Sequence, residues 1–166
     1  MNHANYYVID TSSLIELKRF PDDVFPTLWK NIESLIDQGF MVSHTEVLKE
    51  LSRQDDALKR WALKRKHFFK ELDAFQIPIV KEILLKYPSL AKSDAETPSA
   101  DPFVIALAVE YLRDPQKTLD RSVQKRIVVS EERLRGSRVR IPLVCEEYNI
   151  RCITLLEMCR SEGWSF

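Results

Sequence analysis

The chain has 166 residues, which is long enough for one domain with a sizeable hydrophobic core. Its 25 basic residues balance 25 acidic ones, so no overall positive charge draws it to nucleic acid, and any such attraction must be local. No run approaches the roughly 18 apolar residues of a membrane span, and residues 1–7 do not resemble a secretory signal. We therefore expect a cytoplasmic protein that has no membrane partner.

Three cysteines, Cys145, Cys152 and Cys159, fall in apolar segments at seven-residue intervals. Their number is odd and their spacing is not that of a zinc site, so buried free thiols are expected. The chain shows no internal repeat and no low-complexity tract that would separate two units. We expect a single domain over residues 1–166.

Short apolar segments alternate with amphipathic ones along the chain. Strands are expected at residues 6–9, 40–43, 74–77, 127–130 and 150–153. Helices are expected from about residue 13 and at 24–38, 45–52, 55–72, 80–87, 102–112, 142–148 and 155–160. Because the best strands are apolar on both faces, the pattern predicts an α/β fold, with a central parallel sheet of four to five strands and helices on both sides.

Asp10 ends the first strand in the stretch YYVIDTSSLIEL. In open α/β sheets, ligands bind where the carboxyl ends of the strands lead into helices. The alternative is that Asp10 is simply the N-cap of the next helix. However, residues 13–16 read S-x-x-E, which predicts a capping box with Ser13 as the N-cap. That would leave Asp10 available for function.

Two more acids lie near the ends of later predicted elements. Residues 43–46 again read S-x-x-E, which assigns Glu46 to capping and leaves Glu50, one turn later, without a local task. A solvated helix carboxylate is the alternative for Glu50. Asp101 precedes Pro102 and could be an N-cap, but if Ser99 caps instead, Asp101 becomes an acid in the first turn of the helix.

The fourth strand ends at Ser130, followed by Glu131 and Glu132. Several carboxylates in one crevice repel one another unless a cation lies between them. Oxygen ligands of this kind suit Mg²⁺ or Mn²⁺. Such ions supply a hydroxide for phosphodiester hydrolysis, so no Ser, Cys or His nucleophile is needed.

The segments YYVIDTSSLIEL, EVLKEL, SADPFVIALA and IVVSEE resemble the successive acidic motifs of PIN domains, in order and spacing across essentially the whole chain. The closing IPLVCEEYNIRCITLLEM is similar to the end of that fold. The nearest subgroup is the bacterial PIN-like family DUF4411, close to VapC-type toxins. The resemblance implies a three-layer α/β/α sandwich and a metal-dependent ribonuclease that an antitoxin protein neutralises. Homodimers are common in the resembled family.

Carried over residue by residue, the resemblance implies catalytic and metal-binding roles for Asp10, Glu50, Asp101 and Glu132. PIN domains often show Thr or Ser, any residue and then Asp at the fourth motif. Here Glu132 takes the place of that Asp, and the departure puts a second metal in doubt. Secondary candidates, which lie beside these acids, are Ser12, Ser130 and Glu131.

Four arginines fall between residues 133 and 140, directly after the fourth motif. A positive rim beside an acidic metal crevice would hold RNA phosphates, and Arg133, Arg135 and Arg138 are the candidates for that role. A solvated surface loop is the alternative.

The leading hypothesis is an Mg²⁺- or Mn²⁺-dependent endoribonuclease, the toxin of a bacterial type II toxin–antitoxin pair. A non-catalytic PIN-like module that binds RNA or protein is the alternative. A phosphatase of the haloacid-dehalogenase type would need an acid where Ser12 stands, and a receiver domain would need an acid pair before Asp10.

Overall fold

The protein folds around a five-stranded parallel sheet, seen in a computed structural model that describes residues 5–53, 56–91, 99–114, 126–134, 136 and 138–166. The strands run in the order β3-β2-β1-β4-β5, and each neighbouring pair is parallel. Their bounds are β1 (Tyr6–Ile9), β2 (Met41–His44), β3 (Phe69–Lys70), β4 (Arg126–Val129) and β5 (Cys152–Ile153). The predicted α/β class with a parallel sheet is confirmed.

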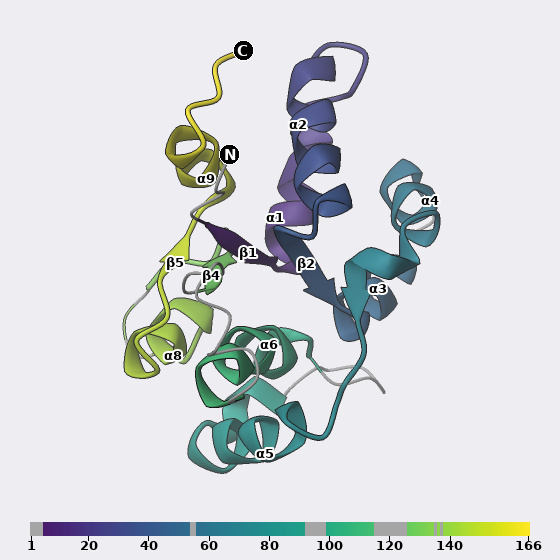
Figure 1. Ribbon diagram of the computed structural model, residues 1–166. Helices are drawn as coiled ribbons and strands as arrows, with labels where there is room; N and C mark the ends of the chain where they lie inside the picture. Colours follow the sequence, from purple (N-terminus) through teal and green to yellow (C-terminus); the bar gives the residue numbers. More distant parts are fainter. Residues whose placement is uncertain (1–4, 54–55, 92–98, 115–125, 135, 137) are drawn as a thin grey trace.

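Helices cover both faces of the sheet (Figure 1). They are α1 (Thr11–Glu16), α2 (Pro26–Asp37), α3 (Thr45–Ser52), α4 (Ala57–Leu63), α5 (Gln76–Lys86), α6 (Asp101–Arg113), α8 (Ile141–Glu147) and α9 (Leu155–Ser161). Short 3₁₀ turns are η1 (Leu17–Arg19), η2 (Lys66–Phe68) and η3 (Pro88–Ala91). Figure 1 shows α1, α2 and α9 on one side and α6 and α8 on the other, with α5 outside α6. This is the expected three-layer sandwich.

The centre of the core is formed by β1, β4 and α6. Tyr7, Val8 and Ile9 are fully buried, because β1 is the middle strand and both of its faces are covered. Helix α6 is apolar almost all round, which the sequence predicts, since it lies between the sheet and α5. Each buried aliphatic side chain of this kind contributes about 1.5–3 kcal/mol to folding.

The third strand lies at Phe69–Lys70 and not at residues 74–77, and the helix predicted over 55–72 ends at Leu63. The reason lies in Asp73. Its Oδ1 accepts hydrogen bonds from the backbone N–H groups of Phe75 and Gln76, at 2.9 Å each, where α5 begins. Pro78 then lies in the first turn of α5. Proline has no backbone N–H, and a helix tolerates it there because N–H groups of the first turn have no acceptor within the helix.

The three cysteines are free thiols, as expected, although Cys152 is only half-buried. Among the described residues, no helix has both the length and the apolar character needed to span a bilayer.

The carboxyl end of β1 is the topological switch point of the sheet. The chain leaves β1 toward β2 on one side, and β4 is added on the other side. In folds of this type the crevice for a ligand opens at such a point. Asp10 lies there, and its backbone N–H donates to the carbonyl oxygen of Val129 on β4 at 2.9 Å.

Candidate functional site

Asp10 is buried at the switch point and is also the N-cap of α1. Its Oδ2 accepts hydrogen bonds from the backbone N–H of Ser12 at 3.3 Å and from the Ser12 hydroxyl at 2.7 Å. The prediction that Ser13 caps this helix is therefore wrong, because α1 begins at Thr11 and the buried Ser13 hydroxyl donates to Glu131 at 3.0 Å. Capping fixes the orientation of Asp10 at the end of β1.

Ser12 and Ser130 form a hydroxyl pair that connects the ends of β1 and β4. Their Oγ atoms are 3.2 Å apart, and Ser130 also donates to Oδ2 of Asp10 at 3.2 Å. The backbone N–H of Glu131 donates to the Ser12 hydroxyl at 3.0 Å. These two secondary candidates thus hold Asp10 in place.

Glu50 connects three helices. Its Oε2 accepts a short hydrogen bond from the hydroxyl of Thr11 on α1, and its Oε1 accepts one from the backbone N–H of Ala100, just before α6, at 2.9 Å. The alternative of a freely solvated carboxylate is therefore wrong. Glu50 instead faces the ends of the two elements that carry Asp10 and Asp101.

The second capping box is also absent. The N-cap of α3 is His44, whose Nδ1 accepts from the backbone N–H of Glu46 at 3.1 Å. Ser43 is fully buried and donates its hydroxyl to the carbonyl oxygen of Ile9 at 2.7 Å, so it cannot reach the helix. Glu46 instead pairs with Lys49 one turn along the helix.

Asp101 is the first residue of α6. Ala100 occupies the N-cap position and makes no side-chain bond, while the backbone N–H of Asp101 donates to the Ser99 hydroxyl at 3.4 Å. Asp101 is therefore a first-turn acid, which is the second of the two roles that the sequence left open.

The electrostatics show that the predicted acids affect one another. Burial first, and then the charge of Glu132, raise the pKa of Asp10 to about 6, although the hydrogen bond from Ser12 works in the opposite direction. The pKa of Asp101 is raised to about 8, first by burial and then by repulsion from Asp10, Glu132 and Glu50. The four acids lie directly after β1, on α3, at the start of α6 and after β4, and they therefore form one acidic cluster, which we define as Asp10, Glu50, Asp101 and Glu132.

Glu131 and Glu132 point to different places. Oε1 of Glu131 accepts from the Ser13 hydroxyl and from the backbone N–H of Leu155 at 2.7 Å, so it joins α1 to α9. Oε2 of Glu132 accepts from the backbone N–H of Ile141 at 2.9 Å. Only Glu132 of this pair is among the charges that raise the pKa values of Asp10 and Asp101. Glu131 is thus placed as a structural residue.

The cluster suits a hard divalent cation by its chemistry. All of its side chains offer carboxylate oxygens, and a cation between them would relieve the repulsion that raises the pKa of Asp101. However, no group of three or more His, Cys, Asp or Glu side chains in the described part of the chain is already arranged to hold a metal. Glu50 and Glu132 both bond to donors of the chain, so they would have to turn toward a shared ion.

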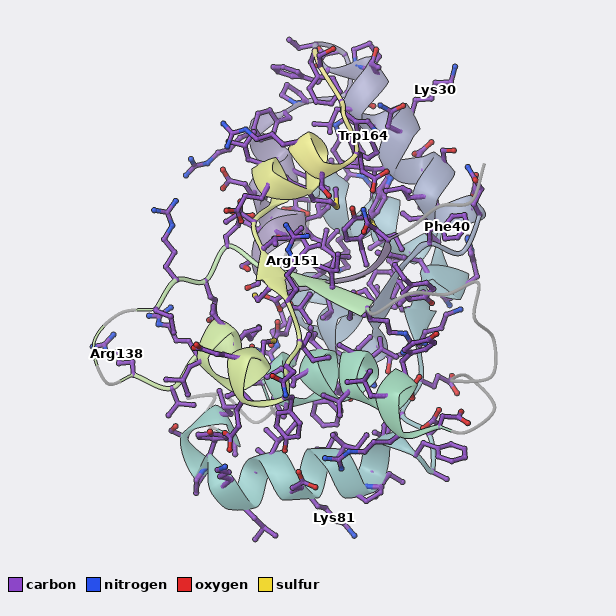
Figure 2. All side chains as sticks on the ribbon, turned by 60° about the vertical axis from the view of Figure 1, so that its left-hand side comes forward. Lys30, Phe40, Lys81, Arg138, Arg151 and Trp164 are labelled. Atoms are coloured by element: carbon purple, nitrogen blue, oxygen red, sulfur yellow. The ribbon has the colours of Figure 1, made fainter. Side chains whose placement is uncertain are left out.

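The predicted basic rim is only partly described. Arg133 and Arg138 are exposed, and Figure 2 shows Arg138 at the edge of the molecule. Arg135 lies outside the described residues. Two other basic residues of this region are committed elsewhere: Arg113 pairs with Glu82 at 3.0 Å, and Arg126 is buried against Glu110 at 2.9 Å.

Sequence reasoning missed Arg140 as a site residue. Its Nη1 lies 3.7 Å from Oε1 of Glu132, which is nearer to the cluster than any contact found for Arg133 or Arg138 among the described residues. The signal in the sequence was its position directly before the helix start Ile141-Pro142.

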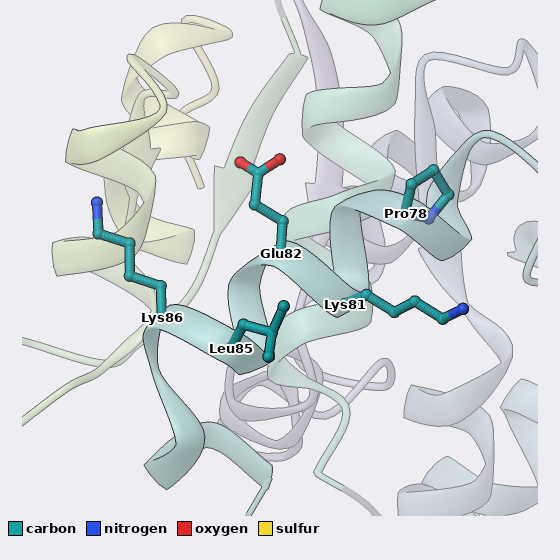
Figure 3. Close-up of a pocket in the computed structure, with 5 residues that line it drawn as sticks. All are labelled: Pro78, Lys81, Glu82, Leu85 and Lys86. Atoms are coloured by element: carbon teal, nitrogen blue, oxygen red, sulfur yellow. The ribbon is translucent and has the colours of Figure 1, made fainter.

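A hollow on the outer face of α5 is not a second site (Figure 3). Its side chains fan outward in the picture and do not converge. Glu82, the one acid among them, is bonded by both Arg113 and the Tyr148 hydroxyl, the latter at 2.7 Å. This contact ties α5 to α6 and α8.

The comparisons with known proteins concern the family only. A family model described as a domain of unknown function, DUF4411, matches residues 7–166. No curated protein and no solved structure shows significant similarity to the chain. The match spans all elements that carry the acidic cluster.

Proposed function

We propose that this chain, which belongs to the DUF4411 family, is a PIN-like endoribonuclease that uses Mg²⁺ or Mn²⁺. The observation that carries the proposal is the acidic cluster at the switch point of a parallel sheet. Burial and mutual repulsion raise the pKa of Asp101 to about 8, and that cost is relieved when a cation binds.

Each residue of the cluster and its neighbours would have one of two roles, to bind the cation or to orient a residue that binds it. Asp10, Asp101 and Glu50 would hold the cation, with Glu132 in the fourth position. Ser12 and Ser130 fix the orientation of Asp10, and the backbone N–H of Ala100 fixes that of Glu50. A bound Mg²⁺ or Mn²⁺ supplies the hydroxide and stabilises the leaving oxygen in phosphodiester hydrolysis.

The partners follow from the resemblance to VapC-type toxins and belong to the proposal. The protein would act on RNA in the cytoplasm and be neutralised by a cognate antitoxin. An arginine side chain of that antitoxin would bind the four carboxylates through charge-assisted hydrogen bonds and so block the site. A homodimer is proposed on the resemblance alone.

One observation favours a second candidate function, a non-catalytic RNA- or protein-binding module. Glu132 is already bonded to the backbone N–H of Ile141 and lies beside Arg140. If these contacts persist, the fourth carboxylate stays out of the metal site and the site is weak.

RNA cleavage by the purified protein distinguishes the two candidates. Single-stranded RNA is incubated with Mn²⁺, with Mg²⁺ or with EDTA, using the native protein, Asp10→Asn and Asp101→Asn. Asp23→Asn, which changes an exposed carboxylate in the turn before α2, is the matched control. We expect metal-dependent cutting that both site variants lose and the control keeps. Binding of RNA without cutting under any metal would favour the module.

A further inference from the structure

Arg140 lies beside the acidic cluster and has N–H donors that make no hydrogen bond among the described residues. Its side chain is 30% exposed and lies next to the Glu132 side chain, which is 23% exposed. The separation of 3.7 Å between Nη1 and Oε1 is too long for a hydrogen bond. Its Nε is buried and has no hydrogen-bond partner among the described residues.

A buried guanidinium nitrogen without a partner costs free energy, so Arg140 would gain from turning toward an acceptor. The 30% of the side chain that is exposed is the part that a ligand from solution can reach first. The planar fork of arginine matches two oxygens of a phosphate and is the usual choice for binding one. Glu132 balances the charge of Arg140 but does not bind its guanidinium with both carboxylate oxygens, because Oε2 accepts from the backbone N–H of Ile141 and Oε1 lies 3.7 Å from Nη1.

No other described arginine of this region has the same arrangement. Arg113 bonds to Glu82 through both of its Nη atoms. Arg126 bonds to Glu110 through Nη1, and its Nε is also buried without a partner among the described residues, but its side chain is only 8% exposed. Arg133 and Arg138 are exposed. Arg140 alone among them faces a carboxylate of the cluster.

We infer that Arg140 binds a phosphate of the RNA strand at the edge of the acidic cluster and releases Glu132 when it does so. The inference rests on the proposed function and adds to it the residue that contacts the substrate. A positive group is needed at this place, because four carboxylates would otherwise repel the phosphate that is to be cut. Release of Glu132 would in turn free its Oε1 to face the cation.

The test measures binding of a fluorescent single-stranded RNA by anisotropy, in EDTA so that nothing is cut, over a series of salt concentrations. The variants are Arg140→Gln and Arg140→Lys. Arg151→Gln is the control, because Arg151 is an exposed arginine that directly precedes β5 (Figure 2). Circular dichroism and thermal unfolding check that each variant is folded.

We expect Arg140→Gln to weaken RNA binding about tenfold. The slope of log K against log salt should fall in magnitude by about 0.7, which corresponds to one phosphate contact on a single strand. Arg140→Lys should keep most of the slope but lose affinity several-fold, since lysine keeps the charge and lacks the fork. Arg151→Gln should match the native protein in affinity and slope.

If Arg140→Gln binds RNA with the affinity and the salt slope of the native protein, the inference is overturned. Metal-dependent RNA cleavage by the native protein would still leave the proposed function intact. The converse result is also possible: the native protein cuts no RNA, but Arg140→Gln binds RNA more weakly than the native protein does. That result would support the phosphate contact of Arg140 and refute the proposed ribonuclease activity. If Arg140 served only to position Glu132, its loss would weaken Mn²⁺ binding in calorimetry and leave RNA binding in EDTA unchanged. A native protein that does not bind RNA at all would overturn the inference as well.

Discussion

Replacing Asp101 by Asn should stabilise the metal-free protein, and the gain should grow as the pH rises. The folded chain keeps the proton of Asp101 up to a pKa of about 8. The unfolded chain releases it near pH 4. Between these values the folded state binds more protons than the unfolded state, so the stability of the native protein falls with rising pH. Asparagine carries no proton to lose, so this loss is absent in the variant.

The size of the effect follows from the pKa of about 8. Between pH 5 and pH 8, the native protein should lose about 1.4 kcal/mol per pH unit from this group, or about 4 kcal/mol in total. Asp101 is only half-buried, and solvent screening reduces this figure to about 2 kcal/mol. The corresponding shift in Tm is about 4–8 °C for a chain of this size. Asp10, whose pKa is raised to about 6, titrates in both proteins, so much of its contribution cancels in the difference.

Urea unfolding in EDTA at pH 5 and pH 8 measures the effect. The gain in the free energy of unfolding from Asp101→Asn should be about 2 kcal/mol larger at pH 8 than at pH 5. Asp23→Asn, which changes an exposed acid, is the control and should show no such difference. Equal gains at the two pH values would refute the reasoning, because they would mean that the folded state does not hold the Asp101 proton.

Three further predictions concern the neighbours of the cluster. Glu131→Gln should cost about 1–3 kcal/mol of stability, because the carboxylate that joins α1 to α9 is lost. Glu132→Gln should cost less, because it also removes a charge that repels Asp10 and Asp101, and it should weaken Mn²⁺ binding. Unfolding and calorimetry on both variants would contradict this if the two effects were exchanged. Arg126→Met should cost about 3 kcal/mol in urea unfolding, since it leaves the buried charge of Glu110 without its arginine, and a cost below 1 kcal/mol would argue against a buried ion pair. Changing the rim residues 133, 135 and 138 to alanine should weaken RNA binding and reduce its dependence on salt concentration. An unchanged salt slope would mean that these arginines do not bind RNA phosphates.

The fold could be predicted from the sequence wherever a segment is either apolar on both faces or periodic. The strand before Asp10 and the helix after Pro102 are of this kind, and both lie within a residue of their predicted places. The third strand could not be found, because Phe69–Lys70 is only two residues long and carries no alternation. Its predicted place at residues 74–77 overlaps the start of α5, where the capping role of Asp73 decides the structure.

The candidate site could be predicted in outline because parallel strands bring their carboxyl ends to one edge. The roles of the neighbouring residues could not. Both S-x-x-E matches predicted serine caps, but Ser13 and Ser43 are buried and bond to other elements, and such long-range bonds leave no mark in the local sequence. Similarly, the approach of Arg140 to Glu132 depends on how α8 packs.

Calorimetric titration of the native protein with Mn²⁺ at pH 7 tests the central claim most directly. We predict binding to the acidic cluster with release of about one proton, because Asp101 must lose its proton to bind a metal and its pKa is raised to about 8. The released proton is seen as a heat that changes with the ionisation enthalpy of the buffer, and Asp101→Asn should bind more weakly and release less. Absence of binding, or binding that is the same in Asp101→Asn with no buffer dependence, would contradict the claim that these acids form a metal site.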